Sequence, residues 1–266
     1  MAEPAPQPAI TLNGVTKTYG GKPVLQGIDL VVPKGQVLGY VGPNGAGKST
    51  TVKILVGMIA GFDGEATVAG HDVRRQPLEV KQRIGYVPEV AAFYESLTVF
   101  EHLLLVGRLY GLSDRVTQKR AEALLEVLEL GARIHSPIGS LSKGMRQKLL
   151  FTAAVLHDPE ILFLDEPLSG LDVQSTVLIK EFVRSLALAG KTVFYCSHIL
   201  DVVERVCDRI VVLRAGQIVA DGPFAALVER SRGGGTLEQV FLELTADGGA
   251  SRRAQALIDA MRQGSA

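Results

Sequence analysis

The sequence of 266 residues has no tryptophan, only two cysteines and no excess of either charge. Cys196 and Cys207 do not form a Cys-x-x-Cys pair, so they indicate neither a disulfide scaffold nor a zinc site. Lysine plus arginine and aspartate plus glutamate number 28 each, which argues against a function that needs a strongly basic surface, such as non-specific nucleic-acid binding. No apolar run reaches the roughly 18–20 residues of a membrane-spanning helix. We therefore expect a globular, cytoplasmic protein.

Short apolar runs alternate with longer amphipathic stretches along the chain, and this rhythm predicts an α/β protein. Strands are expected at 9–15, 28–32, 36–41, 65–69, 84–87, 161–164, 192–196, 209–213 and 217–220. Helices are expected from Lys48 to about 57–61 and at 78–83, 174–188 and 199–206.

The spacing of apolar residues becomes helical between 97 and 130. The side chains expected near one face are Leu97, Phe100, Leu104 and Arg108–Leu109, and the pattern continues with Ala121, Leu124, Leu125 and Leu128. Because no strand candidate interrupts this stretch, we predict a separate all-helical subdomain over about 90–157. Its apolar residues are interpreted as core rather than as a functional site.

The two ends of the chain differ in composition from the main domain, which we place at 10–231. Residues 1–9 form a proline- and alanine-rich tail that lacks the pattern of a secretion signal and is expected to be disordered. Residues 232–266 form a C-terminal extension, with an amphipathic helical segment at 237–244 followed by a polar tail that is expected to be mobile.

A glycine-rich segment follows the strand expected at 36–41. Its residues are Gly42, Pro43, Asn44, Gly45, Ala46, Gly47, Lys48 and Ser49, which match the phosphate-loop pattern G-x-x-x-x-G-K-[ST], and Thr50 comes next in the helix. Glycine lets backbone N–H groups approach phosphate oxygens, and the positive end of the following helix faces the same anion. Lys48 supplies a charge for the β- and γ-phosphates, and Ser49 supplies a ligand for Mg²⁺. The alternative is an ordinary glycine-rich turn, but the flanking strand and helix favour a nucleotide site.

Two carboxylates, Asp165 and Glu166, follow the strand expected at 161–164. The carboxyl end of a buried parallel strand lies beside the position of a phosphate loop. Asp165 is therefore a candidate to hold Mg²⁺, directly or through water, and Glu166 is a candidate to orient and deprotonate an attacking water. Without the phosphate loop, the same residues would be read as a strand that simply ends in polar side chains.

Further motifs, in order over residues 10–222, resemble those of the ATPase subunits of ATP-binding cassette (ABC) transporters. They are Tyr19, at the position of the aromatic that stacks on adenine; Tyr86-Val87-Pro88-Glu89, at the Q-loop; Leu141-Ser142-Lys143-Gly144-Met145, at the signature sequence; Ser169-Gly170-Leu171-Asp172, at the D-loop; and Ser197-His198, at the switch histidine. The resemblance implies a P-loop NTPase core with a mostly parallel sheet, an antiparallel β subdomain and an inserted all-helical subdomain.

The resemblance also implies a role for each of these residues. Glu166 and His198 would be catalytic, and Mg²⁺ would be held by Ser49, Glu89 and Asp165. Contacts to ATP are implied for Tyr19, the segment 42–50, Glu89, Ser142, Lys143, Gly144, Met145 and Asp172.

The family implies that two nucleotide-binding subunits pair head to tail, as two copies of this chain or as one copy with a related cassette. Each ATP at the phosphate loop of one chain would be covered by Ser142 and Gly144 of the other. Hydrolysis then separates the pair, and this movement acts on separate transmembrane permease subunits. An apolar surface for those subunits is expected at Phe93, Tyr94 and Leu97. The chain would lie peripherally on the cytoplasmic face of the membrane.

Three positions depart from the family pattern. Glu89 replaces glutamine in the Q-loop, and Lys143 and Met145 replace glycine and glutamine in the signature. An acidic side chain at position 89 favours a metal ion but is repelled by phosphate. Together with the segment 237–241, these variants resemble the ATPases of ABC-2-type exporters, and we therefore expect a role in export.

Other interpretations stay open at this point. The same ATPase core serves in DNA repair, chromosome maintenance and translation, although the neutral charge and the lack of a coiled-coil insertion disfavour these roles. An importer ATPase and a regulatory module that binds nucleotide without hydrolysis are further alternatives. Tyr19 could only pack against its neighbours, His198 could only be solvated, and Ser142 and Asp172 could act only as helix N-caps.

Overall fold

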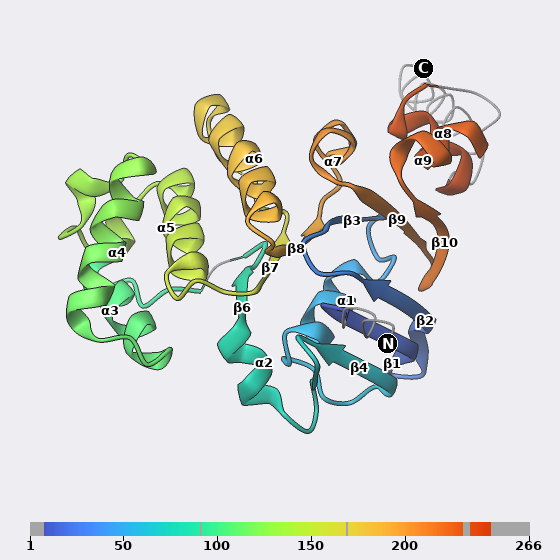
Figure 1. Cartoon of the computed structure of the whole chain (residues 1–266), viewed down its shortest axis with the longest axis horizontal. Coiled ribbons are helices and arrows are strands. Elements are labelled where there is room, and N and C mark those ends of the chain that lie inside the picture. The colour runs from blue at the N-terminus through green and yellow to red at the C-terminus, as the bar shows by residue number, and fades with distance from the viewer. Residues whose placement is uncertain (1–7, 91, 169, 231–234, 246–266) are drawn as a thin grey trace, which may run out of the picture.

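The central element of the fold is a six-stranded sheet, seen in a computed structural model that describes residues 8–90, 92–168, 170–230 and 235–245 (Figure 1). The strand order is β10-β9-β3-β8-β7-β6. The strands are β3 (Val37–Val41), β6 (Ile84–Val87), β7 (Ile161–Asp165), β8 (Thr192–Cys196), β9 (Arg209–Arg214) and β10 (Gln217–Gly222). All neighbours are parallel except β9 and β10. The carboxyl ends of β3, β7 and β8 therefore lie at one edge of the sheet.

A second, antiparallel sheet has the order β2-β1-β4-β5. Its strands are β1 (Ile10–Tyr19), β2 (Lys22–Val32), β4 (Asp63–Val68) and β5 (His71–Asp72). β1 and β2 extend beyond the predicted ranges, because their pairing continues to Tyr19 and Lys22 although the apolar alternation does not. The antiparallel β subdomain implied by the sequence is thus confirmed.

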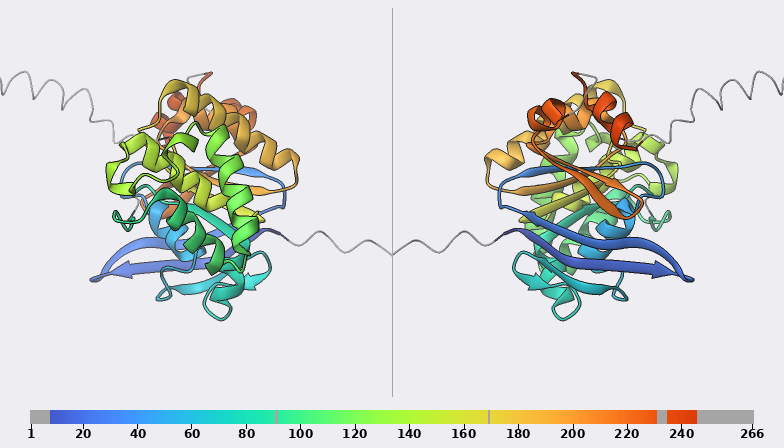
Figure 2. Two further views of the ribbon diagram at one scale, coloured as in Figure 1. Left: turned by 90° about the vertical axis from the view of Figure 1, so that its left-hand side faces the viewer. Right: turned by 90° about the vertical axis from the view of Figure 1, so that its right-hand side faces the viewer.

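α1 (Lys48–Leu55) lies between the two sheets, and its buried Val52, Ile54 and Leu55 share one hydrophobic core with residues of both. The other face of the central sheet is covered by α6 (Val173–Leu188), α7 (Leu200–Val206), α8 (Phe224–Arg230) and α9 (Leu237–Thr245). Figure 2 shows these helices above the central sheet and the antiparallel strands below it. α9 confirms the helical segment expected at 237–244, whereas α8 and β5 have no counterpart in the sequence prediction.

The remaining helices precede or follow β6. α2 (Pro77–Arg83) leads into that strand, and α3 (Val99–Leu109), α4 (Asp114–Val127) and α5 (Lys143–Val155) lie to one side of the sheets (Figure 1). Short 3₁₀ turns at Gly131–Arg133 and Ile138–Ser140 connect α4 to α5. The limits 10–231, 90–157 and 232–266 stay a prediction. Residues 1–7, 232–234 and 246–266 of the predicted tails lie outside the described residues.

The buried face of α3 differs from the predicted one. The residues that turn inward are Val99, Leu103 and Gly107, whereas Leu109 is 76% exposed. The reason is a close helix crossing: a Cβ on Gly107 would lie 2.2 Å from the Thr117 hydroxyl of α4. This approach needs a residue without a side chain, and it rotates the helix so that the glycine rather than Leu109 faces the partner.

Candidate functional site

The glycine-rich segment forms the turn between β3 and α1. Gly47 precedes the helix with φ +110°, in the left-handed region that glycine adopts without strain. A Cβ on Gly42 would lie 2.4 Å from the Leu213 carbonyl oxygen of β9, so only glycine fits there. The Gly216 amide donates to the Ala46 carbonyl at 3.0 Å. The turn between β9 and β10 thus supports the phosphate loop from behind.

Lys48, the first residue of α1, is directed back across its own loop. Its Nζ donates to the carbonyl oxygens of Gly42 at 2.7 Å and Pro43 at 3.3 Å. The residue is only 9% exposed. These two bonds keep a cation over the loop and partly desolvated, which strengthens its attraction for an anion bound there.

A cleft of about 880 Å³ opens in front of this loop. The residues predicted for the site that line it are Tyr19, Gly42, Pro43, Asn44, Gly45, Gly47, Lys48, Ser49, Thr50, Glu89, Asp165, Glu166 and His198. They come from β1, from the phosphate loop and α1, from the last residue of β7, and from the chain just after β6, β7 and β8. The volume and the concave shape suit a small-molecule ligand.

The acidic side of the cleft surrounds Ser49. Its hydroxyl is hydrogen-bonded to Asp165, a carboxylate that is 3% exposed. Burial raises the pKa of Asp165, and the nearby charges of Glu89 and Glu166 add to this effect, whereas Ser49 and Lys48 oppose it. The carboxylate is therefore held in a place where a cation would stabilise it.

Glu166 directly follows β7, and contacts with the end of the neighbouring strand β8 fix its position. Its backbone amide donates to the Cys196 carbonyl at 3.0 Å, and its carboxylate lies 2.8 Å from Nδ1 of His198. The Ser197 hydroxyl donates to the same carboxylate oxygen at 3.3 Å. The backbone of Glu166 has φ +51°, a left-handed conformation that a residue with a side chain rarely adopts. Such strain at a polar residue facing a cleft is typical of functional sites.

Tyr19 is at the rim of the cleft, at the end of β1, and is 47% exposed. The ammonium group of Lys17 lies 4.6 Å from the centre of its ring. The ring therefore does not pack into the core, and one of its faces is held by a cation. This geometry leaves the side chain available to a ligand.

The signature residues lie outside the cleft lining, as a second group with the D-loop. Ser142 caps α5 by accepting from the Met145 amide, and Asp172 caps α6 by accepting from the Ser175 amide at 2.8 Å. A Cβ on Gly144 would lie 2.8 Å from the Gly170 carbonyl, so the two motifs are in close contact. Ser142 and Asp172 therefore both act as helix N-caps, and their expected roles toward ATP stay a prediction. Lys143 begins α5 beside them, and Ser169 is outside the described residues.

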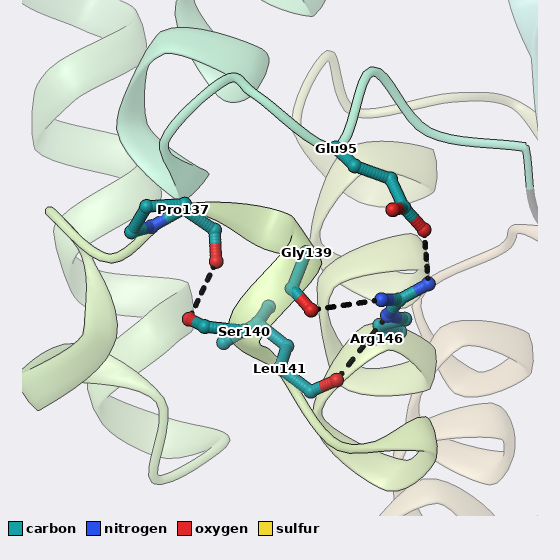
Figure 3. A network of polar contacts seen from close by, with 6 residues as sticks. All are labelled: Glu95, Pro137, Gly139, Ser140, Leu141 and Arg146. Atoms are coloured by element: carbon teal, nitrogen blue, oxygen red, sulfur yellow. Dashed lines mark hydrogen bonds and ion pairs between the residues drawn. The ribbon is translucent and has the colours of Figure 1, made fainter.

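Arg146, in the first turns of α5, connects the signature to the loop after β6 (Figure 3). Its guanidinium donates to Glu95 Oε1 at 2.9 Å, to the Gly139 carbonyl at 3.1 Å and to the Leu141 carbonyl at 3.2 Å. We call this set of contacts the Arg146 bridge. It links the segment before Ser142 to the segment that contains the predicted docking surface.

That docking surface is smaller than the sequence suggests. Tyr94 is 70% exposed, but Phe93 and Leu97 are half-buried against the core of the helical region. Phe93 also contacts the His102 ring edge to face, with ring centres 5.2 Å apart. Of the three residues predicted to form the surface, only Tyr94 is fully available.

Four residues that line the cleft have no counterpart in the sequence prediction: Lys22, Pro23, Val24 and Phe241. The first three follow the turn after Tyr19. Their closeness to Tyr19 in the sequence could have identified them as residues of the site. Phe241 comes from α9, far from the other motifs along the chain. Its signals in the sequence are an amphipathic segment and the resemblance of residues 237–241 to the ABC-2-type exporters, and neither reveals what the side chain contacts.

Comparisons with known proteins agree with this geometry. Residues 25–169 match the family model described as ABC transporter. The chain is 39% identical to the linearmycin resistance ATP-binding protein LnrL of Bacillus subtilis (strain 168), over 86% of this chain and 73% of the relative. It is 40% identical to the Nod factor export ATP-binding protein I of Rhizobium meliloti (strain 1021), over 86% of this chain and 68% of the relative.

The solved structures that resemble this one have the same fold. One described as the ATP binding subunit of an ABC transporter has a TM-score of 0.84 and 31% identity, covering 89% of this chain and 99% of that one. A nucleotide-free ATP-binding cassette from an ABC transporter has a TM-score of 0.70 and 25% identity, covering 82% and 92%. Among the described residues, no helix is long and apolar enough to cross a membrane. The chain belongs to the ABC transporter family and is one of its ATP-binding, ATP-hydrolysing subunits.

Proposed function

We propose that the chain hydrolyses ATP in the cleft in front of the phosphate loop and thereby drives export through separate transmembrane subunits. The observation that carries this proposal is the convergence of Lys48, Asp165, Glu166 and His198 on one cleft from separate segments of the chain. Export is supported by relatives whose names include Nod factor export, and by the sequence variants at positions 89, 143 and 145.

The chemistry assigned to the cleft is attack of water on the γ-phosphate. Glu166 accepts a proton from the water as the new P–O bond forms, and the bond to the ADP oxygen breaks. His198, 2.8 Å from the carboxylate, keeps Glu166 oriented towards the cleft. Lys48 offsets the negative charge of the phosphates, and the backbone amides of the loop bind their oxygens.

The acidic side of the cleft fits Mg²⁺. Ser49, Asp165 and Glu89 offer oxygen ligands, and the raised pKa of Asp165, caused mainly by burial, reflects a carboxylate that a cation would stabilise. Within the described ranges, no group of three or more acidic, histidine or cysteine side chains could hold a metal by itself. An ion at Ser49 and Asp165 would take further ligands from water and phosphate. When bound, Mg²⁺ would supply positive charge to the reacting phosphates.

A second nucleotide-binding subunit completes the site in this proposal. ABC subunits dimerise and work with transmembrane subunits, and here Ser142 and Gly144 lie outside the cleft of their own chain. Together with Lys143, Met145 and Asp172, they are assigned to the ATP held by a partner cassette. Exposed Ser142 at the N-terminus of α5 offers a hydroxyl and backbone amides to a phosphate.

The transmembrane subunits are assigned to the loop after β6, where Tyr94 is exposed. The chain would then lie on the cytoplasmic face of the membrane as a peripheral subunit. Roles in DNA repair, chromosome maintenance or translation are disfavoured by the balanced charge and by the export relatives.

Replacement of Glu166 by glutamine is the test of this assignment. Purified Glu166→Gln should lose ATP hydrolysis by about a hundred- to ten-thousand-fold, because the amide cannot accept the proton of water. The variant should keep ATP binding and form a nucleotide-dependent dimer, measured by light scattering with and without MgATP. Lys48→Ala serves as the binding-deficient control. Hydrolysis at the parent rate in Glu166→Gln would contradict the assignment of the base.

A further inference from the structure

α9 forms part of the wall of the cleft. Leu237 and Val240, at its first and fourth positions, are buried against α7 and α8 with exposed fractions of 0% and 2%. The next residue, Phe241, lines the cleft, and Leu242 is 52% exposed. Phe241 comes four residues after Leu237 and therefore lies on the same side of the helix. It is half-buried against the same core and its remaining surface lines the cleft, whereas Leu242 points to solvent.

Both ends of α9 are attached to elements that support the site. At its start, the Leu237 amide donates to Glu204 Oε2 of α7 at 3.2 Å, and α7 begins two residues after His198. At its end, the Leu244 carbonyl accepts from Arg214 Nη1 at 3.1 Å. Arg214 ends β9, whose hairpin turn donates from Gly216 to the phosphate loop. The position of Phe241 is thus fixed relative to the rest of the cleft.

The chemistry of the lining divides the cleft into two parts. Lys48, Ser49 and the loop amides suit phosphate, which gains nothing from a phenyl ring. Besides His198, the aromatic side chains among the described lining residues are Tyr19 and Phe241. Aromatic rings stack on nucleobases without a requirement for hydrogen bonds. An apolar ring held in a nucleotide cleft therefore matches the base rather than the phosphates.

We propose that Phe241 is a nucleotide-binding residue that contacts the base of ATP, so that the C-terminal extension supplies part of the nucleotide site. The inference rests on the proposed function of the cleft. It gives the base a second aromatic contact besides the one expected from Tyr19. Because α9 packs on α7 and on the end of β9, ATP binding would also stabilise the attachment of the extension.

The absence of tryptophan from the chain allows a direct optical test. Phe241→Trp introduces one reporter in the cleft, and Leu242→Trp introduces one on the solvent side of the same helix. MgATP should change the emission of Phe241→Trp in a saturable way and leave Leu242→Trp unchanged. Magnesium tripolyphosphate, which lacks a base, should not reproduce the change. An emission of Phe241→Trp that ignores MgATP, or that responds equally to tripolyphosphate, would overturn the proposal.

Equilibrium binding of a fluorescent ATP analogue gives the second measurement. Phe241→Ala should weaken binding about tenfold through loss of one base–aromatic contact, whereas Phe241→Tyr should bind like the parent. Circular dichroism verifies that Phe241→Ala keeps its helices. Parent-like affinity of Phe241→Ala, with binding abolished in Lys48→Ala, would reject the role of Phe241 and leave the proposed function intact. Parent-like binding in Lys48→Ala would instead contradict the proposed site itself.

Discussion

At the scale of single residues, the site concentrates unfavourable conformations and charges. Glu166 has a left-handed backbone, and Asp165 is a carboxylate almost without solvent contact. Each feature costs folding free energy and is stable only because neighbours compensate, through the Cys196 carbonyl for Glu166 and through Ser49 and Lys48 for Asp165. Residues that lower the stability of the fold and face a ligand cleft are typical of positions that are retained for function.

Asp165 gives a prediction with a defined sign. Burial raises its pKa, so the folded protein holds this proton more tightly than the unfolded chain does, and the stability associated with the protonated form is lost as the pH rises through the folded pKa. Asp165→Asn should therefore raise the melting temperature of the nucleotide- and metal-free protein at neutral pH. The gain should shrink as the pH falls through the raised pKa of the folded protein and be absent below the range in which an ordinary carboxyl titrates.

Asp172 is the matched control because its pKa is shifted in the other direction. Hydrogen bonds from Ser175 lower the pKa of Asp172 to about 2, so its charged form stabilises the fold above the usual carboxyl pKa and the stability is lost on acidification. Asp172→Asn should lower the melting temperature at neutral pH. A less stable Asp165→Asn at neutral pH would show that burial is not the dominant effect at that carboxyl.

At the scale of elements, α5 connects the parts of the molecule that are expected to meet ATP, the partner and the membrane subunits. The Arg146 bridge joins α5 to Glu95 and to the carbonyls that precede Ser142. Gln147, the next residue, donates to the Pro167 carbonyl at 3.0 Å, immediately after Glu166. A displacement of the loop after β6 would therefore reach both the signature and the catalytic strand.

Arg146→Ala tests this connection. It removes three hydrogen bonds made by a charged group that is about one-third exposed, and we expect a loss of about 1–3 kcal/mol in the free energy of unfolding, measured by urea denaturation. ATP binding by the isolated chain should be unchanged, because no atom of the bridge lines the cleft. Nucleotide-dependent dimerisation should weaken, because Ser142 loses its support.

Arg108→Ala is the control for the loss of an arginine. Arg108 pairs with Asp114 at the exposed surface of the helical region, and such pairs contribute little to stability. If Arg146→Ala behaves like Arg108→Ala in both stability and dimerisation, the bridge has no coupling role.

The sequence predicted the elements whose signals are local and missed those that depend on distant partners. The phosphate loop, Asp165, Glu166 and His198 each follow a predicted strand, so the edge of the sheet brings them together. The α3 face was wrong because Gly107 is selected by contact with Thr117 on another helix. Phe241 was missed because only the packing of α9 on α7 and α8 places it in the cleft.

At the scale of the whole molecule, the chain has two separate surfaces to which we assign contacts with ATP. One is the cleft, and the other is the group formed by the start of α5 and the D-loop, with Gly144 against Gly170. Within one chain, the two surfaces do not face each other. Two chains related by a two-fold axis would bring each surface against the other, and two equivalent contacts would form at once.

Crosslinking of engineered cysteines tests this arrangement. Native thiols should not interfere, because Cys196 is fully buried and burial raises the pKa of both Cys196 and Cys207, which lowers their reactivity. Asn44→Cys introduces a thiol at the phosphate loop and Lys143→Cys one beside Ser142. Leu188→Cys is the control site, since it is 91% exposed at the far end of α6, about 24 Å along the helix from Asp172.

The decisive measurement mixes Asn44→Cys and Lys143→Cys chains, both carrying Glu166→Gln, and oxidises them with and without MgATP. We predict a disulfide between the two chains that forms with MgATP and is absent without it, and no product when Leu188→Cys replaces Lys143→Cys. Failure to form the disulfide with MgATP, or equal formation without nucleotide, would contradict a shared ATP site between two chains.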